Sequence, residues 1–228
     1  MSGISVIIPA FNAEATLAET IESILTQTVA ADEIIVVDDG STDRTGVLAA
    51  DFPGLKVIRQ KNRGAASALN AGIAASTGEL LTFLDADDLW EADKLEKQSV
   101  QLRSRPDLDA VGGYMRTFVC PSAHPDQVAR YRLPEAPEPC WLTGALMVRR
   151  HCFERCGHFS EDLAVAFNID WFDRLRNSGA SLAMLETVVL RRRIRPGSLS
   201  HRSASRDAGM VEMARRAIAR RRRVDERS

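Results

Sequence analysis

Short apolar runs recur along the first half of the chain, and each is followed by a turn or by apolar residues at helical spacing. The runs are rich in aliphatic residues, which is typical of strands buried in a parallel sheet. The predicted strands are Ser5–Pro9, Glu33–Val37, Lys56–Arg59, Leu80–Leu84 and Ala110–Phe118. The predicted helices between them are Ala13–Thr28, Ser41–Asp51, Gly64–Ser76 and Asp93–Ser104. Strands that alternate with helices indicate βαβ units and a mostly parallel sheet flanked by helices.

The second half of the chain has a less regular pattern. Five prolines within Cys120–Pro139 predict a long loop or lid. The elements predicted after it are a strand over Trp141–Arg149, a short helix over Arg150–Cys156, a helix over Asn168–Ser178, one or two strands within Leu182–Arg193 and an arginine-rich helix over Ala204–Arg223. No repeat or linker interrupts the chain, so we predict one domain in two lobes over residues 1–228.

The charge of the chain is divided unevenly between its halves. The net charge is −1, but residues 1–110 carry 9 Lys and Arg against 18 Asp and Glu, whereas residues 111–228 carry 21 against 13. An acidic half suggests a site that needs a metal, and a basic half suggests an anionic ligand or surface. The four cysteines have no CxxC spacing, and neither a signal peptide nor an apolar run of about 20 residues is present. We therefore expect a reduced, cytoplasmic protein without a transmembrane segment.

Acidic residues follow the strand Leu80–Leu84 directly. Asp85, Asp87 and Asp88 lie within four positions, and like charges this close are costly unless a cation accompanies them. Carboxylate oxygens suit Mg²⁺ or Mn²⁺. The carboxyl ends of strands are also where open α/β sheets bind ligands. A solvated loop that caps the next helix would explain the same residues, so the neighbouring strand ends must decide.

Three other predicted strands end in polar or glycine-containing segments on the same edge. These segments are residues 9–12 (PAFN), 38–41 (DDGS) and 61–64 (KNRG). Together with the acidic segment they offer an aromatic ring, carboxylates, a turn with glycine and a metal site. A nucleotide diphosphate needs these parts for stacking, hydrogen bonding, close backbone approach and screening of the pyrophosphate.

Four segments in order resemble the successive motifs of the family 2 glycosyltransferases: Val6–Asn12 (VIIPAFN), Glu33–Thr45 (EIIVVDDGSTDRT), Asn62–Ile73 (NRGAASALNAGI) and Gly78–Trp90 (GELLTFLDADDLW). The resemblance continues more loosely through Thr143–Leu163 and Ile169–Gly179. It implies the GT-A fold, an α/β fold with a Rossmann-like, mostly parallel sheet and a smaller mixed lobe on the acceptor side. Residues 1–110 would then bind the nucleotide sugar, residues 111–203 would form the acceptor side, and residues 204–228 would form a terminal helix.

The resemblance also implies an activity and its participants. Family members transfer a sugar from a nucleotide-diphosphate donor to an acceptor with inversion at the anomeric carbon. For this chain we expect a UDP-sugar donor, a hydroxyl acceptor and assistance by Mn²⁺ or Mg²⁺, and no nucleic-acid partner.

Individual residues take roles by their position in these motifs. Pro9 and Phe11 would line the nucleoside pocket, and Asp39, with Asp38, would recognise the base. The full set implied for the nucleotide sugar is Pro9, Phe11, Asp38, Asp39, Gly64, Asn70, Asp85, Arg193 and Arg195, and the set implied for the metal is Asp87, Asp85 and His201. Capping of the helix at Ser41 is an alternative role for Asp38 or Asp39, and a polar role in the core is an alternative for Asn70.

The general base departs from the family pattern. Relatives place a Glu-Asp pair before the helix that here carries IDWFDRL, and Phe167 and Asn168 stand in its place. An amide cannot accept the proton of the acceptor hydroxyl. Asp170 at the start of the same helix is the first substitute, followed by Asp162 and Glu161. A favourable interaction with the helix dipole would explain Asp170 equally well.

The late metal ligand also departs from the pattern. Many relatives supply a histidine after an arginine-rich strand, and Arg195 stands near that place here, with His201 a few residues later. Either His201 substitutes, or Arg192, Arg193 or Arg195 contacts the diphosphate as charge develops on it. We favour the arginines.

Two other functions remain open. The missing Glu-Asp pair suggests a non-catalytic nucleotide-sugar-binding module. A sugar-phosphate nucleotidyltransferase shares the sheet type, but the chain lacks an early glycine-rich signature with Arg or Lys. The arginines within residues 215–223 suggest a peripheral contact with a membrane surface or an acidic partner.

Overall fold

The computed structural model describes residues 3–120, 123, 133–163, 165–194, 212, 215 and 216. Its strands are β1 (Ile4–Ala10), β2 (Glu33–Asp38), β3 (Lys56–Arg59), β4 (Leu80–Phe83), β5 (Leu89–Trp90), β6 (Ala110–Val119), β7 (Glu138–Cys140), β8 (Met147–Arg149) and β9 (Leu182–Ile194). Its helices are α1 (Leu17–Leu25), α2 (Thr45–Asp51), α3 (Ala65–Ala75), α4 (Lys94–Ser104), the 3₁₀ turn η1 (Thr143–Ala145), α6 (His151–Cys156) and α7 (Phe167–Asn177).

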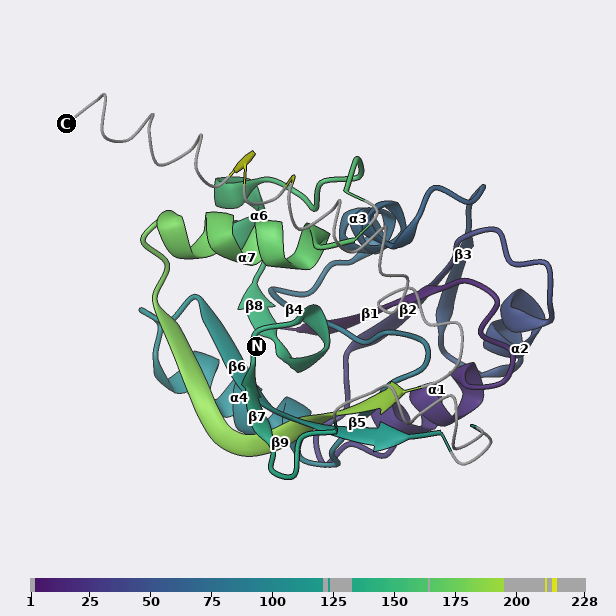
Figure 1. Ribbon diagram of the computed structural model, residues 1–228, viewed down its shortest axis with the longest axis horizontal. Helices are drawn as coiled ribbons and strands as arrows, with labels where there is room; N and C mark the ends of the chain where they lie inside the picture. Colours follow the sequence, from purple (N-terminus) through teal and green to yellow (C-terminus); the bar gives the residue numbers. More distant parts are fainter. Residues whose placement is uncertain are drawn as a thin grey trace.

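One sheet connects the two halves of the described chain. Its order is β3-β2-β1-β4-β8-β6-β9-β5, with β7 paired to β6. The first four strands are parallel, as predicted. Beyond β4 the sheet is mixed, because β8 runs antiparallel to both β4 and β6, whereas β6 and β9 are parallel. Figure 1 shows helices on both sides of this sheet, and the predicted α/β architecture with a mixed second part is confirmed.

The central strands are buried on both faces because each face has its own helices. In β1, Val6 and Ile8 belong to the core cluster that contains Leu17 and Ile21 of α1. Ile7 points to the other face, into the cluster that contains residues of α3, α6 and α7. Gly72 allows the close approach of α3 on that face, because a Cβ atom there would collide with the Ile7 side chain.

Several predicted element bounds are wrong. The helix predicted from Ser41 begins only at Thr45, and Ser41 does not cap it. The strand predicted over Trp141–Arg149 is interrupted by η1, and only Met147–Arg149 pairs as β8. The two short strands β5 and β7 were not predicted, because strands of two or three residues depend on the partner that tertiary packing provides. The last strand is continuous over Leu182–Ile194, in agreement with one of the two alternatives.

Some predictions fall outside the described residues. They include the ligand candidates Arg195 and His201, most of the Cys120–Pro139 loop and most of the terminal arginine-rich helix. The proposed division of residues 1–228 into functional halves remains a prediction. None of the helices in the described part of the chain combines the length and apolar character that a membrane crossing needs.

Candidate functional site

The carboxyl ends of β1, β2, β3 and β4 meet at one edge of the sheet. Register aligns Ala10 with Asp38 and Asp38 with Arg59, and Ile7 with Phe83. Because the strands are parallel, the four segments singled out by the sequence leave the sheet side by side. The structure therefore brings together the loops after these strands, as Figure 1 shows.

The loops after β1 and β2 are joined by hydrogen bonds. Asn12 adopts a left-handed backbone with φ of 48°, and its Oδ1 accepts a bond of 2.9 Å from the Thr42 amide. The Asn12 amide donates to Ser41 Oγ at 3.0 Å. This junction holds the adjacent Phe11 with 46% of its surface exposed. An exposed aromatic ring at the strand end can stack on a planar ligand.

Asp39 organises the loop after β3. Its Oδ1 accepts hydrogen bonds from Gln60 Nε2 at 2.7 Å and from the Arg63 amide at 2.9 Å. Its Oδ2 accepts one from the Gly64 amide at 2.8 Å. Gly64 has φ of 91°, which favours glycine at the start of α3. Asp39 is therefore buried by the turn that it shapes, and it caps no helix.

Asp38 has a different environment from Asp39. Its Oδ1 accepts a bond of 2.8 Å from the Ser41 amide, which closes the turn after β2. Its Oδ2 has no hydrogen-bond partner among the described residues, although Arg59 Nε lies 3.6 Å away. Gly46 leaves space for this oxygen, because a Cβ there would lie 2.7 Å from it. The side chain is 1% exposed and supports the turn after β2, and its role towards the base stays a prediction.

The acidic turn after β4 contains three carboxylates in unequal environments. Asp85 is exposed, Asp87 is half-buried and Asp88 is buried. Desolvation by the surrounding protein and the Asp87 charge raise the pKa of Asp85 to about 6, while the Arg192 guanidinium opposes the rise. Desolvation and the other two carboxylates raise the pKa of Asp88 well above its usual value. The turn thus accumulates negative charge that a cation would relieve.

Arg193 lies beneath this turn and not in front of it. Its Nε donates to the Asp87 carbonyl at 2.7 Å, and its Nη2 pairs with Glu19 Oε2 at 2.5 Å. Its amide donates to Asp88 Oδ1 at 2.7 Å. The side chain is 4% exposed, and its guanidinium lies 4.8 Å from the Phe118 ring centre. The guanidinium thus contacts the acidic turn and Glu19, and the diphosphate contact of Arg193 stays a prediction.

Side chains alternate between the two faces of β9, so Arg192 points away from the face that carries Arg193. Arg191 and Arg193 share one face of β9, and both guanidinium groups lie over Phe118. Arg192 is on the opposite face, and its charge acts on Asp85, Asp88 and Cys140. The sequence offered Arg192, Arg193 and Arg195 for the diphosphate, and the period of two along a strand separates Arg192 from Arg193.

The candidate bases are held in different ways. Asp170 is 1% exposed, and its Oδ2 accepts bonds from Arg174 Nε at 3.0 Å and from Ser160 Oγ at 3.1 Å. Asp162 is 64% exposed in its side chain and pairs with Arg216 Nη2 at 2.5 Å. The bonds from Arg216 lower the pKa of Asp162. Asp170 is therefore buried and paired with Arg174, and its role as the base stays a prediction.

Glu161 and Asn70 join the donor-side helix α3 to the loop of residues 157–163. Glu161 Oε2 pairs with Arg63 Nη2 at 2.8 Å, and its Oε1 accepts a bond of 3.0 Å from Asn70 Nδ2. Asn70 also exchanges two bonds of 3.0 Å with the backbone of Phe159. These contacts hold the 157–163 loop to α3, and the donor-pocket role of Asn70 stays a prediction. No signal in the sequence identified Glu161 as its neighbour.

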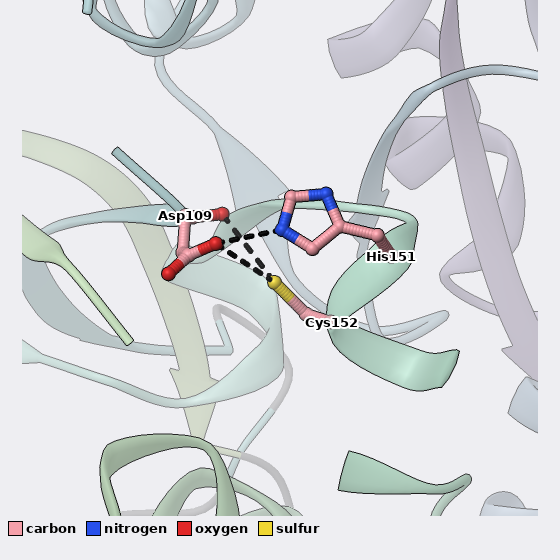
Figure 2. A group of neighbouring side chains, drawn as sticks. All are labelled: Asp109, His151 and Cys152. Atoms are coloured by element: carbon pink, nitrogen blue, oxygen red, sulfur yellow. Dashed lines mark hydrogen bonds and ion pairs between the residues drawn. The ribbon is translucent and has the colours of Figure 1, made fainter. Parts of the chain in front are cut away.

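A second cluster of titratable groups lies at the opposite edge of the sheet. Asp109, His151 and Cys152 each offer a metal-ligand atom within 4.8 Å of the others (Figure 2). His151 Nε2 lies 2.7 Å from Asp109 Oδ1, but Asp109 Oδ2 is bound by Arg155 at 3.0 Å and by the Ser181 amide at 2.9 Å. Burial and the Asp109 charge raise the pKa of the Cys152 thiol to about 12.

These contacts bear on whether the Asp109, His151 and Cys152 cluster binds a metal ion or joins structural elements. Arg155 and the Ser181 amide already bind one oxygen of Asp109, which leaves fewer of its lone pairs for an ion. The cluster can supply ligands, yet its contacts describe a hydrogen-bonded junction between α6 and the starts of β6 and β9.

Comparison with known proteins agrees with this fold and arrangement of loops. Residues 5–160 match the family described as glycosyl transferase family 2. TarS from S. aureus in complex with UDP-GlcNAc superposes with a TM-score of 0.70 at 20% identity, over 86% of this chain and 60% of that one. This likeness shows that the fold is of the GT-A type. The chain belongs to glycosyl transferase family 2.

Two curated relatives resemble the chain to different extents in sequence identity and in the share of the chain that is matched. The chain is 32% identical to the uncharacterised glycosyltransferase EpsJ of Bacillus subtilis, over 86% of this chain and 62% of EpsJ. It is 40% identical to WfgD of Escherichia coli, a UDP-Glc:alpha-D-GlcNAc-diphosphoundecaprenol beta-1,3-glucosyltransferase, over 42% of this chain and 39% of WfgD. The chain therefore spans less than two thirds of the length of these relatives.

Proposed function

We propose that this protein transfers a sugar from a nucleotide-diphosphate donor, a UDP-sugar, to a hydroxyl acceptor with inversion. The observation that carries the proposal is the meeting of four loops at one sheet edge, with Phe11 and Asp39 on one side and the acidic turn on the other. Family membership and the nucleotide-sugar complex of TarS support the same donor class.

The nucleoside would lie against Phe11, with Pro9 completing the wall and Asp39 recognising the base. Within the described residues Asp39 Oδ2 accepts one hydrogen bond, from Gly64. A carboxylate oxygen has two lone pairs, so Oδ2 retains the capacity to accept the imide N–H of a uracil ring. This capacity favours UDP over a nucleotide that presents only acceptors at this position.

The acidic turn fits a divalent cation. Its carboxylate oxygens are the ligands that Mg²⁺ and Mn²⁺ prefer. The pKa values of Asp85 and Asp88 are raised first by desolvation and then by the neighbouring carboxylates, and Arg192 opposes both rises. Asp87, with Asp85, would hold the ion. A bound ion would neutralise charge on the leaving diphosphate. Arg192 would add a second positive charge, and Arg193 would hold the turn in place.

We assign the general base to Asp162, because its side chain is 64% exposed and can reach an acceptor once Arg216 releases it. Asp170 is buried against Arg174, and Glu161 is engaged by Arg63 and Asn70. In the proposed step the Asp162 carboxylate takes the proton of the acceptor hydroxyl as that oxygen bonds to the anomeric carbon. The bond from this carbon to the diphosphate breaks with inversion, and its electron pair leaves with the diphosphate. Arg216 must release Asp162 before this step.

A non-catalytic nucleotide-sugar-binding module is the second candidate. The observation that favours it is the combination of Asn168 at the place of the usual base with a buried, paired Asp170. Such a module would bind the donor as described but would break no glycosidic bond.

One experiment tests the donor site and separates these candidates. Thermal shift is measured with UDP, GDP and CDP, with and without Mn²⁺, and release of UDP from UDP-glucose and UDP-GlcNAc is then followed. We expect stabilisation by UDP with Mn²⁺ and slow donor hydrolysis, both lost in Asp87→Asn and retained in the exposed control Asp51→Asn. Stabilisation without release of UDP would support the binding module. If none of the nucleotides stabilises the protein, the proposed donor site is wrong.

A further inference from the structure

We infer that Glu161 is a positioning residue that couples the nucleotide-binding turn, residues 60–64, to the loop of residues 157–163. The inference rests on the proposed function, because it assigns the 60–64 turn to the donor and the 157–163 loop to the acceptor side. It concerns a route of contact that begins at Asp39 and ends beside Asp162.

The first part of the route is the 60–64 turn. Its backbone is held by Asp39, which accepts bonds from the amides of Arg63 and Gly64 and from the Gln60 side chain. A ligand that bonds to Asp39 therefore acts on the carboxylate that determines where Arg63 lies. The Arg63 backbone faces Asp39, while its guanidinium reaches in the other direction to Glu161 at 2.8 Å.

The second part of the route is Glu161 itself. One carboxylate oxygen is bound by Arg63 and the other by Asn70 at 3.0 Å. The bonds from Asn70, Ser67 and Arg63 lower the pKa of Glu161 despite partial burial. Glu161 is therefore held as an anion that accepts hydrogen bonds from both Arg63 and Asn70, and it is a poor proton acceptor. Through these bonds it connects segments that are distant in sequence.

The third part of the route is the support of the loop behind Glu161. Phe159 is 3% exposed, and its ring packs edge-on against Phe83 with centres 5.7 Å apart. Ser160 Oγ donates to Asp170, and Arg174 Nη2 donates to the His158 carbonyl at 2.7 Å. The loop is thus held from behind by the core and by α7, while Glu161 connects its front to the donor side.

The exposure of the Arg63–Glu161 ion pair indicates that it positions the loop and contributes little to the stability of the fold. The Arg63 side chain is 64% exposed and that of Glu161 is 38% exposed, and pairs this accessible to water contribute little to folding. Their removal should leave the fold intact. What it removes is the contact through which the 60–64 turn acts on the segment that carries Asp162.

Hydrogen exchange measured by mass spectrometry, with and without saturating UDP and Mn²⁺, tests this coupling in the full chain. In the wild type we expect UDP to slow exchange in both the 60–64 turn and the 157–163 loop. Amides that open only when the ligand leaves should slow by up to about a hundredfold at UDP concentrations a hundred times the dissociation constant. Glu161→Gln should keep the UDP effect in the turn and lose it in the loop.

Two further variants separate coupling from a general loss of structure. Glu154→Gln, an exposed change on α6, should behave as the wild type. The exchange of charges in Arg63→Glu with Glu161→Arg should restore part of the UDP effect in the loop. Slowing of the turn alone in the wild type, or an unchanged loop response in Glu161→Gln, would overturn the inference. If UDP slows neither segment in the wild type, the proposed donor site itself is wrong, and the coupling falls with it.

Discussion

Replacing Arg193 by methionine tests whether this residue supports the acidic turn or contacts the diphosphate. The methionine keeps an apolar stem and removes the guanidinium. Three interactions are lost: the bond to the Asp87 carbonyl at 2.7 Å, the pair with Glu19 at 2.5 Å and the contact with the Phe118 ring at 4.8 Å. All three lie in an environment where the arginine side chain is 4% exposed.

The cost of Arg193→Met can be estimated from these contacts. A hydrogen bond from a charged group contributes about 1.5–3 kcal/mol. The side chain of Glu19 is 55% exposed and can return to water, so the loss of that pair costs about 1 kcal/mol or less. The cation–π contact adds about 0.5–2 kcal/mol. Relief of the desolvated guanidinium offsets part of this loss, and we expect the free energy of unfolding to fall by about 2–4 kcal/mol.

Urea unfolding followed by tryptophan fluorescence measures this loss, with Arg191→Met as the matched control. Arg191 shares the same face of β9 and lies 5.1 Å from the Phe118 ring centre, but it is exposed. The control should lose about 1 kcal/mol or less. If Arg193→Met unfolds at the urea concentration of the wild type and only its binding of UDP is weakened, the reasoning from burial is refuted.

Three further predictions concern single carboxylates. Asp87→Asn should lose the Mn²⁺-dependent stabilisation by UDP and keep or raise the Tm of the free protein, because one of three neighbouring like charges is removed; an unchanged thermal shift with UDP and Mn²⁺ would contradict its role. Asp170→Asn should lower the free energy of unfolding in urea by about 2–4 kcal/mol, because its half-buried arginine partner loses the opposite charge; native stability with lost turnover would instead indicate a base. For Asp109, burial raises the pKa, but the bonds from Arg155 and His151 outweigh it and leave the pKa lowered. The folded state is therefore stabilised above the unfolded pKa of about 3.9, and this contribution is lost as pH falls through the folded pKa. Urea midpoints below about pH 4 should fall less steeply in Asp109→Asn than in the wild type, and equal slopes would count against the assignment.

The donor half of the fold followed from local pattern. The strands β1, β2 and β4 are continuous apolar runs, and helices with apolar residues at helical spacing separate them. A parallel sheet buries both faces of such strands, so their sequences carry an unambiguous signal. Because consecutive strands of this kind end at one edge, the meeting of the acidic turn with Asp39 and Phe11 could be predicted from the amino-acid sequence alone.

The second half was harder to predict because its strands take their partners from distant segments. η1 interrupts the run predicted over Trp141–Arg149, and β5 and β7 exist only through pairing with β9 and β6. The direction of each arginine in β9 depends on which face of the strand meets the acidic turn. Local pattern cannot supply that information, and the sequence therefore left Arg192, Arg193 and Arg195 as alternatives for the diphosphate contact.

The acidic turn shows most clearly which features follow from the sequence and which depend on the tertiary structure. Composition and spacing established that three aspartates follow a buried strand, and they predicted a nearby cation, because both inferences depend only on neighbours in sequence. Only the folded chain distinguishes the three: Asp85 is exposed, Asp87 is half-buried and Asp88 receives the backbone amide of Arg193. The bond to Asp88 comes from a residue more than a hundred positions away in the sequence, and it forms only when β9 returns to the acidic turn.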